Sequence, residues 1–189
     1  MAVKVDPRRV VTESDFIALA RRRFLKGQKL DVAGLAVELG ISRATAYRWA
    51  GNADELTARV IESLVIATHE LCLRDAEGKG AERIVDVYAR GMRYMSTGPY
   101  RRWLESTDVE TALRLVASKQ SPVQGTMIRL WDETLTEEVE RGNVTLPTDP
   151  HTMAYAFVRI GESFLYADLV SGEQVDVEKA VDLIKLLVS

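Results

Sequence analysis

Apolar residues recur at helical spacing along almost the whole 189-residue chain, and no run alternates between apolar and polar residues as a half-buried strand would. Capping residues and glycines divide this pattern into segments at residues 12–26, 31–39, 42–49, 52–75, 81–96, 99–106, 108–117, 122–141, 150–170 and 176–188. We therefore expect an all-α fold of about ten helices without a sheet.

The predicted helix ends rest on side chains that can cap a helix. Thr12, followed three residues later by Asp15, is similar to a capping box, with Asp in place of the usual Glu or Gln. Residues of the same type precede four other segments: Asp31, Ser42, Asn52 and Asp176. Gly40 follows a helix at a position that favours a residue tolerant of positive φ.

The two parts of the chain differ in charge. Residues 1–50 contain 10 lysines and arginines against 5 acidic residues, whereas residues 51–189 contain 15 against 23. A basic segment on an acidic body suggests a head that binds a polyanion, although such asymmetry also occurs in unrelated proteins. We expect two domains, an N-terminal head at 1–51 and a helical body at 52–189.

Several classes of protein find little support. The N-terminal residues do not form a signal peptide, no run could span a membrane, and Cys72 is the only cysteine, so we expect a cytoplasmic protein without a disulfide. His69 and His151 lie on different segments and no glycine-rich phosphate motif occurs, so we predict no metal, no cofactor and no enzymatic activity. His69 and Cys72 are one helical turn apart, so a helical enzyme with a thiol–imidazole pair is the alternative.

The most informative segment is residues 31–56, DVAGLAVELGISRATAYRWAGNADEL. It contains two short helical patterns joined by a tight turn at residues 40–42. Apolar residues can pack the two helices together: Leu35, Ala36, Leu39, Ile41, Ala46 and Trp49. This pattern predicts a helix-turn-helix, whose second helix enters the major groove of DNA N-terminus first. A three-helix packing unit without a DNA function is the alternative, and the local positive charge argues against it.

We predict that eight residues of the head contact DNA: Thr12, Lys29, Ser42, Arg43, Ala44, Thr45, Tyr47 and Arg48. Arg43 can bind guanine bidentately, and the methyl groups of Ala44 and Thr45 can contact thymine. Ser42 begins the second helix, where free backbone N–H groups can meet a phosphate. The other four are placed to hold backbone phosphates, which set register rather than sequence.

The same segment resembles the TetR family of transcriptional repressors. The resemblance covers about residues 12–60 and rests on these residues: Leu35-Ala36, Leu39-Gly40-Ile41-Ser42, Thr45, Tyr47, Gly51 and Asp54-Glu55-Leu56. It implies a repressor that binds palindromic operator DNA as a homodimer and carries a helical body for a small-molecule effector. Ala50 departs from the family pattern where Phe is typical, and Ala53 where a Lys often contacts phosphate; Trp49 and Asn52 can partly replace them.

The two long C-terminal segments, 122–141 and 150–170, are candidates for the dimer interface. The second is apolar over more than one face, as a helix buried on all sides would be. Pairing both with their copies would form a four-helix bundle, in which small Ala154 and Gly161 would allow close approach. A buried helix within a monomer is the alternative.

Methionine and aromatic residues are concentrated in the middle of the chain. Together with Glu162 as a polar contact, we predict that they line a ligand pocket: Tyr88, Met92, Met95, Trp103, Met127, Trp131, Tyr155 and Glu162. The same residues could equally form an ordinary core. Residues 161–168 resemble the TetR-type regulators of quorum-sensing-signal degradation, which implies a lactone or acyl-chain effector. A DNA-binding regulator without any effector is the second alternative.

Overall fold

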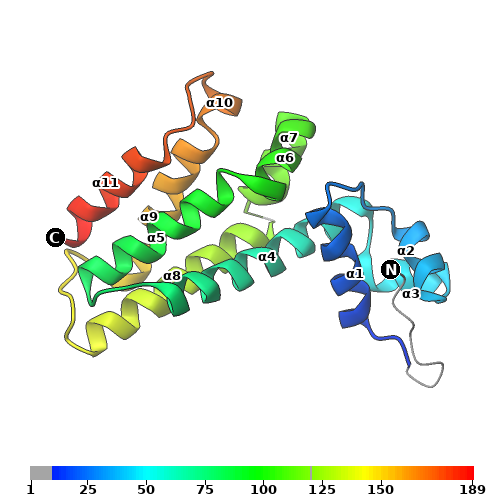
Figure 1. The fold of residues 1–189 in the computed structure, drawn as a ribbon, viewed down its shortest axis with the longest axis horizontal. Helices are drawn as coiled ribbons and strands as arrows, with labels where there is room; N and C mark the ends of the chain where they lie inside the picture. Colours follow the sequence, from blue (N-terminus) through cyan, green and yellow to red (C-terminus); the bar gives the residue numbers. More distant parts are fainter. Residues whose placement is uncertain (1–9, 120) are drawn as a thin grey trace.

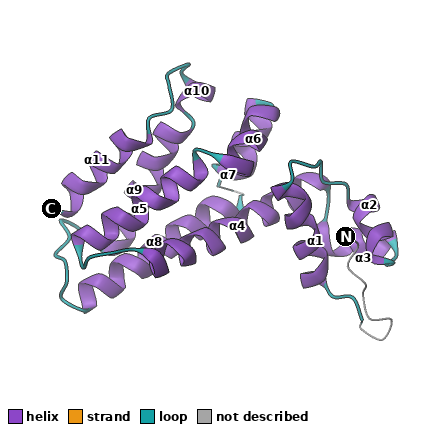
Figure 2. Ribbon diagram, viewed as in Figure 1, coloured by secondary structure: helices purple, strands orange, loops and turns teal. Residues whose placement is uncertain are grey.

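The computed structural model describes residues 10–119 and 121–189, and all regular elements in these ranges are helices (Figure 1; Figure 2). The helices are α1 (Glu13–Leu25), α2 (Val32–Leu39), α3 (Arg43–Ala50), α4 (Ala53–Asp75), α5 (Ala81–Met95), α6 (Gly98–Ser106), α7 (Val109–Val116), α8 (Pro122–Glu140), α9 (Pro150–Leu165), α10 (Ala167–Val170) and α11 (Val177–Val188). The predicted all-α fold is confirmed. The segment predicted as one helix at 150–170 breaks at Tyr166 into α9 and α10.

Local capping chemistry sets the ends of the N-terminal helices as predicted. The Thr12 hydroxyl accepts a hydrogen bond from the Asp15 N–H at 3.3 Å, and the Asp15 carboxylate accepts one from the Thr12 N–H at 2.9 Å. The Ser42 hydroxyl accepts a bond from the Thr45 N–H at 3.0 Å. Gly40 has a φ of +67°, the left-handed conformation that lets α2 end within one residue.

Helices α1, α2 and α3 form a compact head around the fully buried side chains of Phe16, Leu35 and Ala46. Ala50 is also buried, and its small side chain leaves part of this core to be filled by other residues. The ring of Trp49 meets the ring of Phe16 edge-on, with their centroids 6.1 Å apart. Trp49 therefore supplies aromatic bulk next to the position where the family pattern has Phe.

The body consists of long helices that lie side by side, and α4 extends from the head along one side of it (Figure 1). Helices α8 and α9 form the most extensively packed pair, and α4 packs against both α8 and α5. Ala154 and Gly161 were expected between α9 and a second copy, but both are buried within the chain's own core. A Cβ on Gly161 would lie 2.9 Å from the Tyr88 hydroxyl, so glycine here makes room for an internal neighbour.

A buried polar contact connects α4 to α8. The His69 Nε2 lies 2.9 Å from the Thr134 hydroxyl, and the imidazole and the Trp131 ring form a T-shaped pair with ring centroids 5.1 Å apart. Desolvation by burial lowers the pKa of His69 from 6.5 to about 4, against a smaller opposing effect of Glu133. The folded protein therefore holds this histidine in its neutral form.

Neutral His69 should make stability depend on pH. As the pH falls from 6.5 toward 4, the unfolded chain binds a proton on His69 that the folded chain excludes, so stability present above pH 6.5 is progressively lost. The loss attributable to this residue should reach roughly 3 kcal/mol at the acid end. Urea unfolding of wild type and His69→Gln at pH 7 and pH 4.5 measures it, because the variant keeps an N–H donor but does not titrate. Equal pH dependence of the two proteins would contradict the prediction.

Candidate DNA-binding face and ligand cavity

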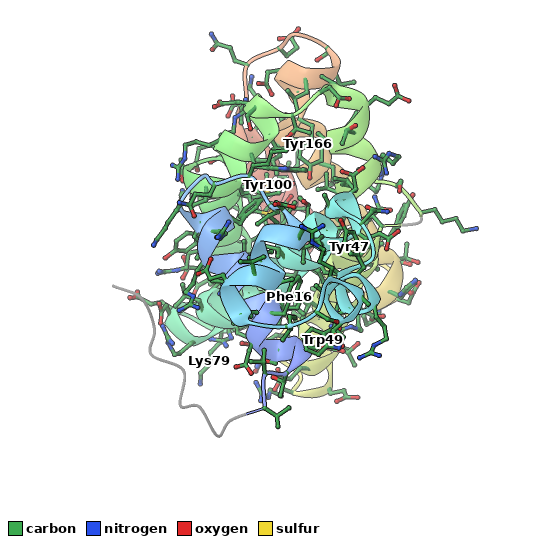
Figure 3. The ribbon with its side chains drawn as sticks, turned by 90° about the vertical axis from the view of Figure 1, so that its right-hand side faces the viewer. Phe16, Tyr47, Trp49, Lys79, Tyr100 and Tyr166 are labelled. Atoms are coloured by element: carbon green, nitrogen blue, oxygen red, sulfur yellow. The ribbon has the colours of Figure 1, made fainter. Side chains whose placement is uncertain are left out.

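The exposed side of α3 presents most of the residues predicted to contact DNA. Ser42, Arg43, Ala44, Tyr47 and Arg48 are exposed, and Thr45 is half-buried. Tyr47 projects from the end of the molecule formed by the head (Figure 3). Within the described residues neither arginine of this face forms an ion pair. Their guanidinium groups are thus available to a polyanion.

Other contacts hold α3 in place from behind. The Arg59 guanidinium of α4 donates to the backbone carbonyl of Trp49, near the end of α3, and pairs with the carboxylate of Glu13 on α1. The Arg59 side chain therefore connects α4 to two helices of the head, α3 and α1. The exposed face of α3 is fixed relative to α4, and no residue of that face takes part in the connection.

The two predicted contacts outside α3 are also at the surface. Lys29 is exposed in the loop before α2. Thr12 is exposed too, but its hydroxyl is engaged with Asp15 in the capping box, to whose carboxylate it donates at 2.8 Å. A contact from this position to phosphate would therefore share the hydroxyl with the cap.

A cavity of about 220 Å³ lies inside the body between α4, α5, α8 and α9. Its walls are mostly aliphatic and aromatic, and they include Leu25 from the C-terminal end of α1 in the head. Trp131 is the centre of the aromatic wall, because its ring contacts the rings of His69, Tyr88 and Phe157 at centroid distances of 5.1, 5.6 and 5.2 Å. This is an apolar chamber of the kind that binds small molecules.

A few polar groups interrupt the apolar wall. The carboxylate of Glu162 accepts hydrogen bonds from Gln124, at 2.8 and 3.1 Å, and from Arg159. Burial raises the pKa of Glu162, although the contacts with Gln124 and Arg159 act in the opposite direction. The hydroxyls of Tyr100 and Tyr166 lie 2.7 Å apart, and Figure 3 shows both residues in the same part of the body. Burial raises the pKa of both tyrosines, so both keep their protons at neutral pH.

The cavity brings together most of the residues predicted to line a pocket. Those that border it are Tyr88, Met92, Met95, Met127, Trp131 and Glu162. Trp103 lies outside the cavity wall and packs on Phe24 and Tyr100, at centroid distances of 6.2 and 5.9 Å. Tyr155 is 52% exposed on the outer side of α9, so its ring does not reach the interior.

Sequence reasoning missed several cavity residues. Tyr100 and Tyr166 are 66 positions apart, and no local pattern indicates that their hydroxyls meet. His69 and Cys72 are separated by one helical turn, a spacing that admits a thiol–imidazole pair or, as the expected alternative, two ordinary packing or surface residues. In the structure His69 bonds to Thr134 instead, and burial raises the pKa of the Cys72 thiol to about 11. Cys72 is therefore a protonated wall residue at neutral pH.

The described residues contain neither a metal-ligand cluster nor a membrane-spanning helix. Within residues 10–119 and 121–189, no group of three or more His, Cys, Asp or Glu side chains is arranged to hold a metal ion. None of the helices described here combines the length and the apolar character that a membrane crossing requires.

Comparison with known proteins identifies the family. Residues 79–189 match the sequence profile described as "Tetracyclin repressor-like, C-terminal domain". The transcriptional repressor QsdR of R. erythropolis, a TetR-family protein of known structure, is 32% identical, with a TM-score of 0.83 over 93% of each chain. The repressor AlkX of Dietzia sp. is 19% identical, with a TM-score of 0.63 over 93% of this chain and 92% of its own. NemR of E. coli is 16% identical, with a TM-score of 0.58 over 95% of this chain and 98% of its own, and so shares the fold.

A search of curated proteins finds no match. The family profile spans more than half of the chain, and the QsdR match spans nearly all of it. The profile covers only the body, whereas the helix-turn-helix of the head was recognised separately from residues 31–56. The two independent observations agree, and the chain belongs to the TetR family of transcriptional regulators.

Proposed function

We propose that this protein is a repressor that binds a palindromic operator as a dimer and releases it when a small apolar or lactone-like effector enters the cavity. The observation that carries the proposal is the continuity of α4, which supports the unpaired cationic face of α3 at one end and borders an apolar cavity at the other. The lactone-like character rests on the resemblance of residues 161–168 to regulators of quorum-sensing-signal degradation.

The proposed DNA contacts follow from the position of each side chain. Arg43 reads a guanine edge, Ala44 and Thr45 contact thymine methyl groups, and Tyr47 and Arg48 hold phosphates. Ser42 already caps α3 with its hydroxyl, so it would meet a phosphate through the dipole and N–H groups of the helix N-terminus. Thr12 and Lys29, which lie outside α3, would contact phosphates of the flanking DNA backbone.

The proposed dimer uses the outer side of α8 and α9. These helices form an antiparallel hairpin, and the Asp132 carboxylate lies 2.9 Å from His151 Nδ1 across it. Ile128 precedes Asp132 by one turn on α8, and Tyr155 follows His151 by one turn on α9. Because the two helices are antiparallel, both residues lie on the same side of this contact. Half-buried Ile128 and exposed Tyr155 thus form an apolar edge on that side. Pairing this edge with its copy gives a two-fold protein that matches a two-fold operator.

Release of DNA would follow from a change in the separation of the two heads. Both heads must reach successive major grooves, about 34–36 Å apart. Leu25 of α1 borders the cavity, and the Arg114 guanidinium of α7 pairs with the Asp54 carboxylate at the start of α4, 2.7 Å away. A ligand that favours another position of these elements weakens DNA binding by its differential affinity for the two states.

Removing a side chain of the reading face should weaken operator binding without affecting the dimer. An operator is first selected from a pool of random DNA duplexes, and binding is measured by fluorescence anisotropy. Arg43→Ala should weaken binding about fivefold or more, because a bidentate base contact is worth about 1–3 kcal/mol, and Tyr47→Ala should weaken it through the loss of a phosphate contact.

Lys185→Ala is the matched control, because it also removes one positive charge, from an exposed position on α11 far from the head. It should bind the operator as wild type does. Wild-type affinity in Arg43→Ala and Tyr47→Ala would refute the assignment of α3 as the reading helix.

The dimer edge can be tested by introducing a charge. Tyr155→Glu should convert the dimer to a monomer, because two carboxylates would meet across the two-fold axis in an apolar contact. Leu186→Glu is the control, since Leu186 is 74% exposed and belongs to α11 rather than to the two helices that carry the proposed edge. Sedimentation velocity measures both. A Tyr155→Glu variant that stays dimeric, or a Leu186→Glu variant that dissociates, would place the interface elsewhere.

A further inference from the structure

The chemistry of the cavity wall narrows the class of effector. We propose that the cavity selects an uncharged, chain-bearing molecule whose head group donates a hydrogen bond, such as an alcohol or an amide, and that His69 is the acceptor. The inference rests on the proposed function only in treating the cavity as the effector site. It predicts weaker binding of carboxylates and simple esters, which the apolar volume alone would admit.

The tautomer of His69 follows from its neighbour. The Thr134 hydroxyl has one proton, and its contact with the backbone carbonyl of Leu130 at 2.8 Å uses that proton, because a carbonyl can only accept. The hydroxyl must therefore accept from His69, whose Nε2 lies 2.9 Å away and so carries the N–H. In the neutral ring the other nitrogen, Nδ1, is then a hydrogen-bond acceptor.

The Nδ1 acceptor is left for a ligand. His69 is 9% exposed and borders the cavity, and no partner of Nδ1 occurs among the described residues. Among side chains that are not exposed in that part of the chain, no fully buried nitrogen or oxygen lacks a partner, so Nδ1 keeps some accessible surface. We assign this surface to the cavity, because His69 is one of the residues that line it. A ligand hydroxyl or amide N–H can satisfy it, whereas an ester or a hydrocarbon cannot.

The charges around the cavity oppose an anionic ligand. Among the described residues, no lysine or arginine borders it, and the one carboxylate that does, Glu162, already accepts bonds from Gln124 and Arg159. Burial disfavours a proton on His69, so this residue supplies no positive charge either. A ligand carboxylate would be buried beside Glu162 without a counter-ion, which is strongly unfavourable.

The tyrosine pair adds a second preference. The hydroxyls of Tyr100 and Tyr166 share one hydrogen bond at 2.7 Å but carry two protons, so one proton remains to be donated. A carbonyl oxygen can accept it. An amide head group, which combines an N–H donor with a carbonyl acceptor, therefore matches the polar groups of this cavity better than an alcohol does. A lactone linked to its chain through an amide also meets this description.

The test compares four probes with the same ten-carbon chain: 1-decanol, decanamide, methyl decanoate and sodium decanoate. Their binding to the full-length protein is measured by calorimetry, and their release of the selected operator by anisotropy. Decanol and decanamide should bind at least about tenfold more tightly than the ester and the carboxylate, because the latter leave Nδ1 unpaired. A carboxylate or ester that binds as tightly as the alcohol would overturn the proposal.

Two variants show whether His69 is responsible. His69→Phe keeps a ring but removes the acceptor, so the preference for decanol over methyl decanoate should disappear. Thr134→Val leaves the ligand-facing residue intact but removes the partner that fixes the tautomer, so the preference should narrow while both probes still bind. Circular dichroism checks that both variants fold. A preference that survives in both variants would overturn the role of His69.

The two readouts separate this inference from the proposed function. If the probes bind with the expected preference but leave the operator bound, the ligand class stands and effector control of DNA binding fails. If no probe binds while the protein still binds its operator, the ligand class fails and the DNA-binding function stands.

Discussion

The structure depends on α4 being one unbroken helix shared by the head and the body. Its first turns complete the head, where Leu56 is fully buried and Arg59 connects the end of α3 to α1. Its later turns carry His69 and Cys72 into the cavity wall. Its 23 residues span about 35 Å as a continuous helix, so under the proposed function a displacement at the cavity would be carried to the base of α3. No flexible linker separates the two tasks.

A second connection runs through α1 and α6, and it is mostly apolar. Phe24 of α1 packs against Trp103 of α6, and the adjacent Leu25 borders the cavity. The ion pair between Asp54 and Arg114 adds a polar contact between α4 and α7, but both side chains are about half exposed, and such pairs contribute at most about 1 kcal/mol. The relative position of head and body is therefore set by packing, which has few alternative arrangements, and less by surface charge.

The parts of this molecule that the sequence predicts well are those decided by neighbouring residues. The cap at Ser42, the turn at Gly40 and the exposed side of α3 all depend on spacings of a few positions. The cavity was only partly predictable, because periodicity shows that α9 is apolar on more than one side but not which side faces inward. Gly161 therefore proved internal and Tyr155 external. Tyr100 and Tyr166 meet only because the fold brings α6 to the end of α9, which no local pattern records.

If the cavity is the effector site, the position of His69 on α4 would link ligand selection to the head. An acceptor inside an apolar wall costs about 1–3 kcal/mol when nothing donates to it, so a donating ligand recovers free energy that other ligands leave unused. The hydrogen bond would form to a residue of α4, the helix that contacts the end of α3 through Arg59. Coupling between two binding sites typically amounts to about 1–3 kcal/mol, which is comparable to this single hydrogen bond. Under the proposed function, one contact would thus distinguish among ligands of equal apolar area and act on the helix that supports the DNA-binding face.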